Sequence, residues 1–194
     1  MDFPSSDLHL WNRFRKGDSQ AFGSIYRMHI TELLSYGYRI TSNRQLIKDS
    51  IHDLFLHIWL HREKLSETDS IKYYLFRSLR NRILQAPSVS SRVLEEFRFD
   101  ELLAETSVED QLIEQETHSA QLSQLKQAID RLPKRQQEVI QLRYFHAFSL
   151  EEISSVMQMN NQSVRNLLHR AILHLRNHFE IVGSLLLALV KIFG

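Results

Sequence analysis

The chain has 194 residues, with 24 Lys and Arg against 23 Asp and Glu, five Gly, three Pro and no Cys. The lack of Cys excludes a disulfide framework and a thiolate metal site, and so few turn residues argue against a strand-rich fold. The charge falls into three blocks: residues 1–85 carry 13 basic and 9 acidic residues, residues 86–118 carry 2 and 9, and residues 119–194 carry 9 and 5. This pattern predicts an all-α protein of two small helical domains joined by an acidic, flexible linker.

Three amphipathic helices are predicted in the first block. Apolar residues recur there at intervals of three and four, which is the spacing of one helix face. They are Leu8, Trp11 and Phe14; Phe22, Ile25, Tyr26, Ile30, Leu33 and Leu34; and Ile47, Ile51, Leu54, Phe55 and Ile58. A turn is expected at residues 16–18, with Asp18 or Ser19 capping the second helix. Three such stripes favour a small helical bundle.

The third of these helices also carries Asp49, His52, Asp53 and His57 away from its apolar stripe. The pattern alone favours a solvated face. His57 and His61 lie four residues apart, a spacing that allows two metal ligands, but no third ligand at a suitable spacing accompanies them. We therefore expect no metal and no cofactor.

A fourth helix is predicted over the segment SIKYYLFRSLRNRIL, residues 70–84. Ile71, Tyr74, Leu75 and Leu79 share its inner face; the outer face carries Tyr73, Arg77 and Arg80, with Lys72 and Phe76 at the flank. Aromatic rings beside cations suit single-stranded nucleic acid, because rings stack on bases and cations pair with phosphates. The alternative, in which Tyr73 and Phe76 complete the bundle core, stays open at this point.

Clear helix boundaries mark the last block. A stripe of Leu122, Leu125, Ile129 and Leu132 stops before Pro133, and a helix over 133–145 is expected to bury Val139, Ile140, Leu142 or Tyr144 in turn. Ser149 and Glu152 have the spacing of a capping box at the start of a short helix. Asn160 is placed to cap the final helix.

The final helix has two distinct faces. Its inner face carries Val164, Leu167, Leu168, Ala171, Ile172 and Leu175; its outer face carries Gln162, Arg165, Asn166, His169 and Arg170. A short helix, a turn and a second helix with an apolar inner face form the helix-turn-helix pattern, whose second helix enters the major groove of DNA. Asn and Gln pair with adenine edges and Arg with guanine. A plain helical hairpin is the alternative interpretation.

The two ends of the chain give weaker signals. The apolar segment 181–194, IVGSLLLALVKIFG, is too short to span a bilayer, so we expect an extension of the last helix that packs on a domain or a partner. The first residues, MDFPSSDLHL, lack the basic run and apolar core of a secretory signal. We therefore expect a cytoplasmic protein that does not span the membrane.

Residues 8–85 and 119–178 resemble the extracytoplasmic-function (ECF) sigma factors, two-domain initiation factors of bacterial RNA polymerase. The segment IKDSIHDLFLHIW is similar to the family's helix that binds the clamp helices of the polymerase, with His52 where the family usually has Gln. SIKYYLFRSLRNRIL is similar to the segment that opens the −10 element, and the preceding HREKLSETDS to the loop that holds a flipped base. The segment from Leu132 to Ala171 resembles the −35-reading domain, with Ala147 and Gln158 where Gly is usual.

The resemblance implies that residues 1–85 bind core polymerase and melt the −10 element, and that residues 119–180 read the −35 element and contact the polymerase flap. Residues 86–118 would be the linker and residues 181–194 a tail. The implied −35 contacts are Gln162, Ser163, Arg165, Asn166, His169 and Arg170. The implied −10 contacts are Lys72, Tyr73, Phe76, Arg77, Arg80 and Asn81. The implied polymerase contacts are Asp49, His52, Asp53, Phe55 and Trp59.

The same resemblance implies a non-catalytic protein whose partners are core RNA polymerase, promoter DNA and an anti-sigma factor, which in some cases is membrane-bound. Two other functions remain to be weighed against it. A stand-alone helix-turn-helix regulator would bind duplex DNA without polymerase and would leave the aromatic and basic face of residues 71–85 unexplained. A metal-dependent hydrolase using His57 and His61 would lack a phosphate-binding loop and a nucleophile motif.

Overall fold

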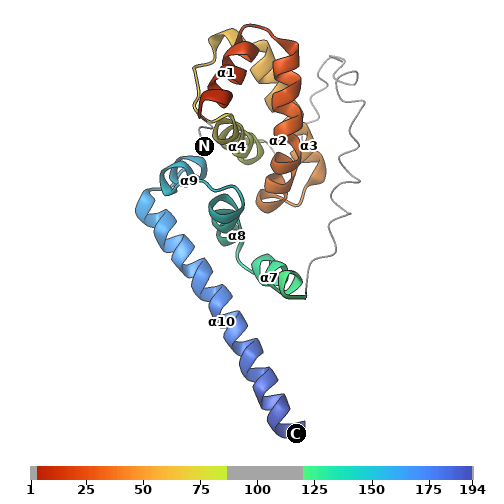
Figure 1. Ribbon diagram of the computed structural model, residues 1–194, viewed down its shortest axis with the longest axis vertical. Helices are drawn as coiled ribbons and strands as arrows, with labels where there is room; N and C mark the ends of the chain where they lie inside the picture. Colours follow the sequence, from red (N-terminus) through yellow and green to blue (C-terminus); the bar gives the residue numbers. More distant parts are fainter. Residues whose placement is uncertain (1–3, 87–119, 194) are drawn as a thin grey trace. The chain divides into compact units, whose positions relative to one another are not determined.

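The computed structural model describes the backbone of residues 4–86 and 120–193, and the side chains of residues 7–86 and 125–177. Every regular element in these ranges is a helix, so the predicted all-α fold class is confirmed. The chain divides into two compact units, residues 1–116 and 117–194. Each unit is described by itself below (Figure 1). Nearly all of the acidic segment 86–118 lies outside the described residues.

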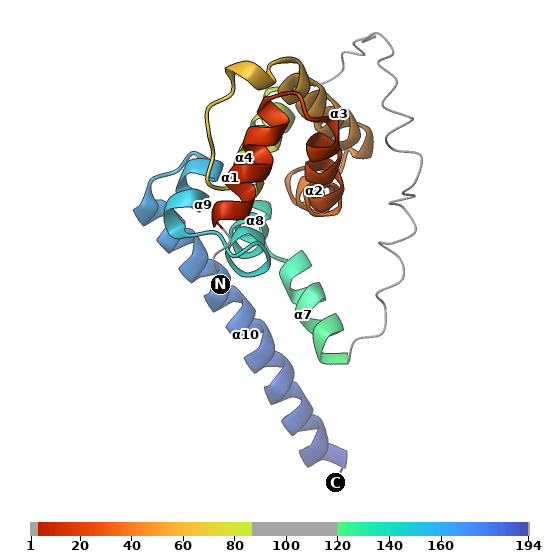
Figure 2. The same ribbon diagram turned by 45° about the horizontal axis from the view of Figure 1, so that its top comes forward.

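The described part of the first unit, residues 4–86, is a bundle of four α-helices. These are α1 (Pro4–Arg15), α2 (Ser19–Ile40), α3 (Arg44–Leu60) and α4 (Ile71–Gln85), with a short 3₁₀ helix, η1 (Arg62–Lys64), after α3. Helix α2 packs against α1, α3 and α4, and α3 also packs against α4. Two views of the ribbon show the four helices gathered into one bundle (Figures 1 and 2).

Aromatic rings fill the core of this bundle. Trp11, Phe14 and Phe55 have no exposed surface, and Phe22 has 3%. The rings of Trp11 and Phe14 lie 5.0 Å apart, and those of Phe14 and Phe22 lie 5.6 Å apart. Trp11 Nε1 donates a hydrogen bond to the carbonyl oxygen of Ser66 at 2.9 Å. This bond attaches the loop between α3 and α4 to helix α1.

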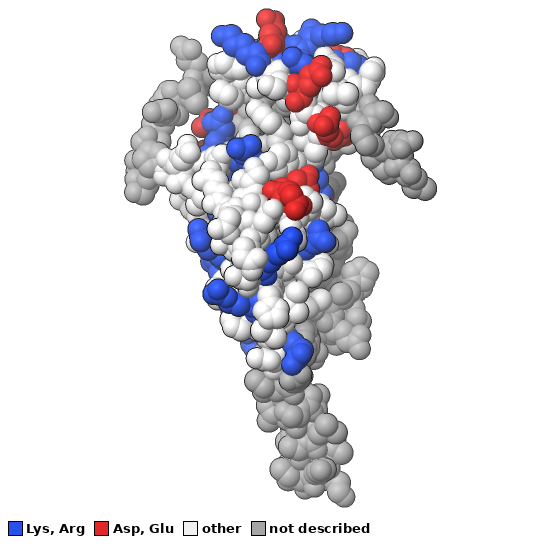
Figure 3. Space-filling view, turned by 90° about the vertical axis from the view of Figure 1, so that its left-hand side faces the viewer, with Lys and Arg blue, Asp and Glu red and all other residues white. Residues whose placement is uncertain are grey.

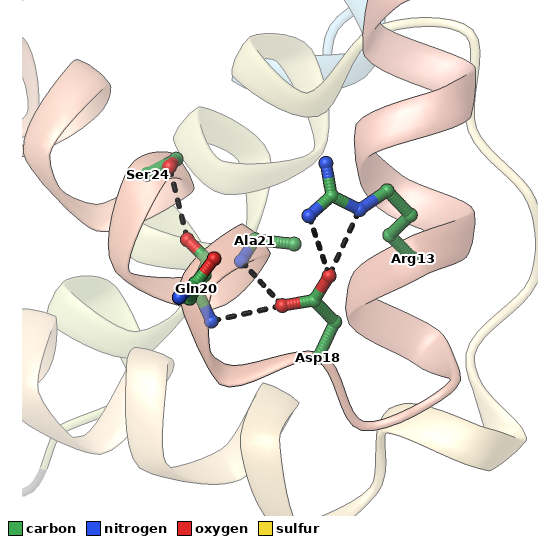
Figure 4. Close-up of polar contacts among 5 residues, drawn as sticks. All are labelled: Arg13, Asp18, Gln20, Ala21 and Ser24. Atoms are coloured by element: carbon green, nitrogen blue, oxygen red, sulfur yellow. Dashed lines mark hydrogen bonds and ion pairs between the residues drawn. The ribbon is translucent and has the colours of Figure 1, made fainter.

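The turn between α1 and α2 is held by Asp18, which confirms that this residue caps α2 (Figure 4). Its carboxylate accepts hydrogen bonds from the backbone N–H groups of Gln20 (2.9 Å) and Ala21 (3.0 Å). Arg13 Nε donates to the same carboxylate at 2.8 Å. The bond from the Ala21 N–H and the bond from Arg13 together lower the pKa of Asp18. Gly17 precedes it with a φ of +90°, a conformation that Gly adopts without strain.

The close approach of α2 and α3 depends on Gly37. A Cβ atom added to Gly37 would lie 2.5 Å from Ile47 Cγ2, and Ile47 is fully buried. No methyl group fits at that distance, so the two helix backbones require Gly at this position.

We therefore expect Gly37→Ala to lower the free energy of unfolding by about 1–3 kcal/mol, measured by urea denaturation, because the helices must separate. The matched test is Ile47→Ala, which removes the obstructing atoms and by itself costs about 2–5 kcal/mol through the cavity it leaves. If the clash is the cause, the double variant is more stable than the sum of the two single losses predicts. Simple additivity would contradict this explanation.

The second unit contains α7 (Ala120–Asp130), α8 (Lys134–Ile140), the π-helical turn η2 (Gln141–Phe145), α9 (Leu150–Met157) and α10 (Asn161–Phe193). Helix α10 packs against α7, α8 and α9. Helices α8 and α9 lie against the N-terminal part of α10, while the rest of α10 extends away from them (Figures 1 and 2). The backbone of α10 reaches Phe193, as expected for an extension of the last helix. The packing of that extension lies outside the described side chains.

The helix expected over 133–145 is interrupted. Val139 and Ile140 are buried as predicted; of the two alternatives that the sequence left open, Leu142 is buried and Tyr144 is 60% exposed. The chain turns as a π helix after Ile140, and the His146 N–H donates to the carbonyl oxygen of Gln141 at 3.1 Å. A π turn has more residues per turn than an α-helix, so the following side chains leave the face that a 3.6-residue period predicts. Ile172, predicted on the inner face of α10, is also 42% exposed.

Candidate nucleic-acid and polymerase interfaces

The turn between α9 and α10 has the geometry of a helix-turn-helix. Ser149 accepts a hydrogen bond from the Glu152 N–H at 3.1 Å, and Glu152 accepts one from the Ser149 N–H at 2.7 Å, which confirms the predicted capping box. Helix α9 ends at Gln158, which adopts the expected left-handed conformation with φ 53° and ψ 50°. Asn160 Oδ1 accepts the Ser163 N–H at 2.7 Å, which confirms the predicted cap of α10. These contacts set the direction in which α10 starts.

The outer face of α10 presents the residues predicted for DNA reading. Gln162, Arg165, Asn166, His169 and Arg170 are exposed, and Ser163 is half-buried beside the cap. Val164 and Ala171, on the inner face, have no exposed surface. Gln162 Nε2 donates to Asn166 Oδ1 at 3.1 Å, so the two amides are held side by side. Together these side chains offer donors and acceptors along one helix face, at the N-terminal end that reads base edges in this fold.

The surroundings of this face favour a polyanion. Residues 153–179 contain no Asp or Glu, while α10 contributes Arg165, Arg170 and Arg176. Figure 3 shows Lys and Arg side chains, without Asp or Glu, directly above the grey C-terminal segment. Cations that gather on one face supply the sequence-independent attraction to phosphates.

Two residues of this unit adopt positive φ although they are not glycine: Ala147, with φ 59°, and Gln158, with φ 53°. Both stand where the family resemblance places Gly. The left-handed conformation brings Cβ close to a carbonyl oxygen and costs about 1–2 kcal/mol for a residue with a side chain.

Ala147→Gly and Gln158→Gly are therefore each expected to raise the free energy of unfolding by about 0.5–1 kcal/mol, since glycine relieves the strain but loses more backbone entropy on folding. Urea denaturation of each variant measures the change. Ser155→Gly is the matched control because it introduces the same residue within the right-handed part of α9, and it should lower stability by about 0.5 kcal/mol, the difference in helix propensity between Ser and Gly. A loss of stability at the two left-handed positions would refute the strain explanation.

Helix α4 places only part of the predicted −10 set on its surface. Arg77 is exposed and Lys72, Tyr73 and Asn81 are half-buried, whereas Phe76 has no exposed surface and Arg80 has 4%. The Phe76 ring stacks on Tyr36 of α2 with centroids 4.8 Å apart. The prediction that Phe76 and Arg80 face the nucleic acid is therefore wrong: Phe76 belongs to the core, the alternative that the sequence had left open. Tyr73, Arg77 and Asn81, spaced by four residues, form the accessible row.

Helix α3 divides the predicted polymerase contacts in a similar way. Asp49 and His52 are exposed, Asp53 and Trp59 are half-buried, and Phe55 is fully buried. Asp49 accepts a hydrogen bond from Gln45 Nε2 at 2.8 Å. Trp59 packs on Phe22 with ring centroids 4.9 Å apart, and the guanidinium carbon of Arg62 lies 4.8 Å from the centre of the Trp59 ring. Phe55 is thus a core residue that supports the surface of α3, and its predicted direct contact is wrong for this conformation.

His57 and His61 stack on each other at the end of α3, with ring centroids 4.3 Å apart. The Nδ1 atom of His61 lies 3.0 Å from the carbonyl oxygen of His57. No group of three or more potential metal ligands occurs among the described residues. Partial burial lowers the pKa of His57, and the positive charges of Arg82 and His61 lower it further. Burial and the neighbouring positive charges thus both disfavour the charged form of His57.

This arrangement predicts that the free energy of unfolding depends on pH. Because the folded chain disfavours the charged form of His57, the unfolded chain takes up a proton first as the pH falls below the ordinary pKa near 6.5. The wild-type free energy of unfolding should therefore fall more steeply between about pH 7 and pH 5 than that of His57→Gln. Urea denaturation at several pH values tests this, and parallel profiles for the two proteins would contradict it.

Some features of these surfaces had no signal in the sequence. Lys72 Nζ forms an ion pair with Glu32 Oε1 of α2 at 2.9 Å, forty positions away in the chain. Tyr144 and Phe145, within the π turn η2, are exposed. Periodicity within one helix cannot reveal a partner on another helix, and it assigns residues beyond an irregular turn to the wrong face.

Residues 25–88 match Sigma-70 region 2, and residues 122–175 match Sigma-70, region 4. Together the two regions cover more than half of the chain. Region 2 thus falls within the first unit, and region 4 within the unit that contains the helix-turn-helix. The chain belongs to the sigma-70 family of RNA polymerase sigma factors, in its extracytoplasmic-function group.

Among the similar proteins, the ECF RNA polymerase sigma factor BldN of Streptomyces coelicolor is 26% identical over 85% of this chain, which spans 62% of BldN. The RNA polymerase sigma factor YlaC of Bacillus subtilis is 25% identical over 79% of this chain and 89% of YlaC. The sigma factor RpoE in complex with the anti-sigma factor NepR, from Bartonella quintana, has a similar fold. Its TM-score is 0.53 at 16% identity, covering 80% of this chain and 94% of that one.

Among the described residues, no helix is long and apolar enough to cross a membrane.

Proposed function

We propose that this protein binds core RNA polymerase and directs promoter-specific initiation of transcription, acting by binding and with no catalytic residue of its own. The observation that carries the proposal is the exposed row of base-reading side chains on α10, in a chain that also carries sigma-70 region 2. A stand-alone regulator would not need that second region. In this proposal residues 1–85 are the polymerase-binding and −10 domain, residues 86–118 a linker, residues 119–180 the −35 domain and residues 181–194 a tail.

The −35 duplex is read by α10 in this proposal. Gln162 and Asn166, linked by their hydrogen bond, present an amide pair to adenine edges, and Arg165 is placed for guanine. His169 and Arg170 lie one turn further along, where they reach the phosphates. Ser163 supports the N-terminus of the helix. A good bidentate contact contributes about 1–3 kcal/mol of discrimination against the wrong base.

The −10 element is opened by α4, whose accessible row is Tyr73, Arg77 and Asn81, with Lys72 beside it. Tyr73 supplies a ring for an unstacked base and Arg77 a cation for the backbone. A single ring contributes about 1–3 kcal/mol per base by stacking. With Phe76 and Arg80 in the core, this face binds through fewer groups than the sequence suggested.

Core polymerase is bound by the polar face of α3, through Asp49, His52 and Asp53, with Trp59 at its end. The flap of the polymerase is contacted by the second unit. The RpoE–NepR pair supports an anti-sigma factor as a further partner of this chain. A transcription factor of this kind acts where the polymerase is, so we place it in the cytoplasm.

The test is transcription by core RNA polymerase with the purified full chain on a library of genomic promoter fragments. We expect specific start sites that disappear without the chain. Arg165→Ala or Asn166→Ala should change which promoters are used, by about five- to a hundred-fold at affected sites, and leave polymerase binding intact. Asp53→Ala should instead weaken polymerase binding and reduce all promoters together.

No promoter-specific transcript would refute the proposed function, and operator binding without polymerase would favour the stand-alone regulator. Equal loss on all promoters for the α10 variants would show that Arg165 and Asn166 are phosphate anchors.

A further inference from the structure

Helix α4 begins in an unusually acidic environment for a surface proposed to bind DNA. Asp7 of α1 accepts the Ile71 N–H at 3.2 Å, and Ser70 accepts the Tyr73 N–H at 3.2 Å. Glu32 of α2 lies beside the same turn, with its Oε1 atom 2.9 Å from Lys72 Nζ. Carboxylates at this end of a helix are stabilised by the unsatisfied N–H groups, whereas a lysine there is disfavoured. Glu32 thus offsets an unfavourable charge on Lys72.

The side chain of Lys72 is held inward by these contacts. Its ammonium lies 5.9 Å from the centre of the buried Phe76 ring, and the side chain is only 25% exposed. The second carboxylate oxygen of Glu32 lies 3.9 Å from Nδ1 of His29, which is itself 8% exposed. Glu32 is therefore positioned between a buried imidazole on its own helix and the lysine of α4.

We propose that Glu32 is a positioning residue that restrains Lys72 and lowers the affinity of the α4 face for single-stranded DNA. Lys72 donates a hydrogen bond to Glu32, so a DNA phosphate must displace the Glu32 carboxylate in order to accept that bond. The phosphate also comes close to the negative charge of Glu32. Both effects oppose binding. The inference rests on the proposed −10 role of α4. It makes the affinity of α4 for single-stranded DNA depend on Glu32, which is not one of the residues proposed to contact DNA.

A purely structural role of Glu32 predicts different effects on thermal stability and on DNA binding. If the ion pair only ties α2 to α4, its loss lowers the thermal stability of the protein and leaves DNA binding unchanged. A partly exposed pair of this kind has a small effect on stability, because solvent still screens it. DNA affinity and its salt dependence separate the two roles.

The experiment measures binding of the full chain to a fluorescein-labelled 20-nucleotide single strand of random sequence, by anisotropy at several salt concentrations. Random sequence is suitable because a phosphate contact does not depend on the base. Glu32→Gln should tighten binding about two- to five-fold at low salt and steepen the slope of log affinity against log salt by about 0.7, the value for one further phosphate contact. Thermal melting of each variant confirms that it is folded.

Two further variants complete the design. Lys72→Met should weaken binding, and in the Lys72→Met background Glu32→Gln should give a smaller gain than it gives alone, because the released cation is absent. Glu151→Gln removes one exposed carboxylate from the second unit and controls for net charge; it should change binding by less than Glu32→Gln does.

The outcomes distinguish the inference from the proposed function. If Lys72→Met weakens binding while Glu32→Gln leaves it unchanged or weaker, Glu32 does not restrain Lys72 and the inference is overturned. If Glu151→Gln tightens binding as much as Glu32→Gln, net charge explains the gain and the inference is again overturned. If the single strand does not bind, or Lys72→Met has no effect, the −10 role of α4 fails and the inference fails with it.

Discussion

Each functional helix in this protein is oriented by the burial of one apolar stripe, and the opposite face is left to solvent as a result. In α10 the stripe includes Val164 and Ala171, and in α4 it includes Leu75 and Leu79, all without exposed surface. Complete burial of a leucine side chain contributes about 1.5–3 kcal/mol, more than a surface hydrogen bond or ion pair. The core therefore decides which side chains of α4 and α10 lie at the surface.

The connections between helices also fix the orientation of the helices that they join. The capping box of Ser149 and Glu152, the left-handed Gln158 and the cap at Asn160 occupy a short stretch of chain, and each satisfies backbone groups that a helix end leaves unpaired. The helix-turn-helix keeps this geometry although two of its positive-φ positions, Ala147 and Gln158, carry side chains. The strain is localised in the connections, while the recognition helix itself is regular.

Charge is distributed differently in the two units. On α10 the outer face lies in a stretch of sequence without any acidic residue, so no carboxylate within that stretch offsets the positive charges of Arg165 and Arg170. At the start of α4 the cation is paired with Glu32, and Asp7 covers the helix end. This difference agrees with the proposed roles, in which α10 holds the −35 duplex and Glu32 weakens the binding of a single strand by α4.

The amino-acid sequence by itself determined the helices, their caps and the outer face of α10. These features depend on neighbours within one helical turn: the three-and-four spacing of apolar residues, the Ser149–Glu152 pair, and Asn160 before the last helix. Family motifs then linked the two helical blocks to one class of protein. The left-handed Gln158 was also foreseen, because glycine is usual at that position.

Only the tertiary structure decided which flanking residues belong to the core. Phe76 lies at the border between the two faces of α4, and its stacking on Tyr36 of another helix moves it inside. Arg80 is buried for the same reason, since packing between helices extends the buried arc beyond the apolar stripe, whereas Phe55 belongs to the stripe that the sequence predicted. The π turn after Ile140 exposes Tyr144, and the pairing of Glu32 with Lys72 joins residues forty positions apart. A local pattern contains no information about such partners, because they meet only when the helices pack.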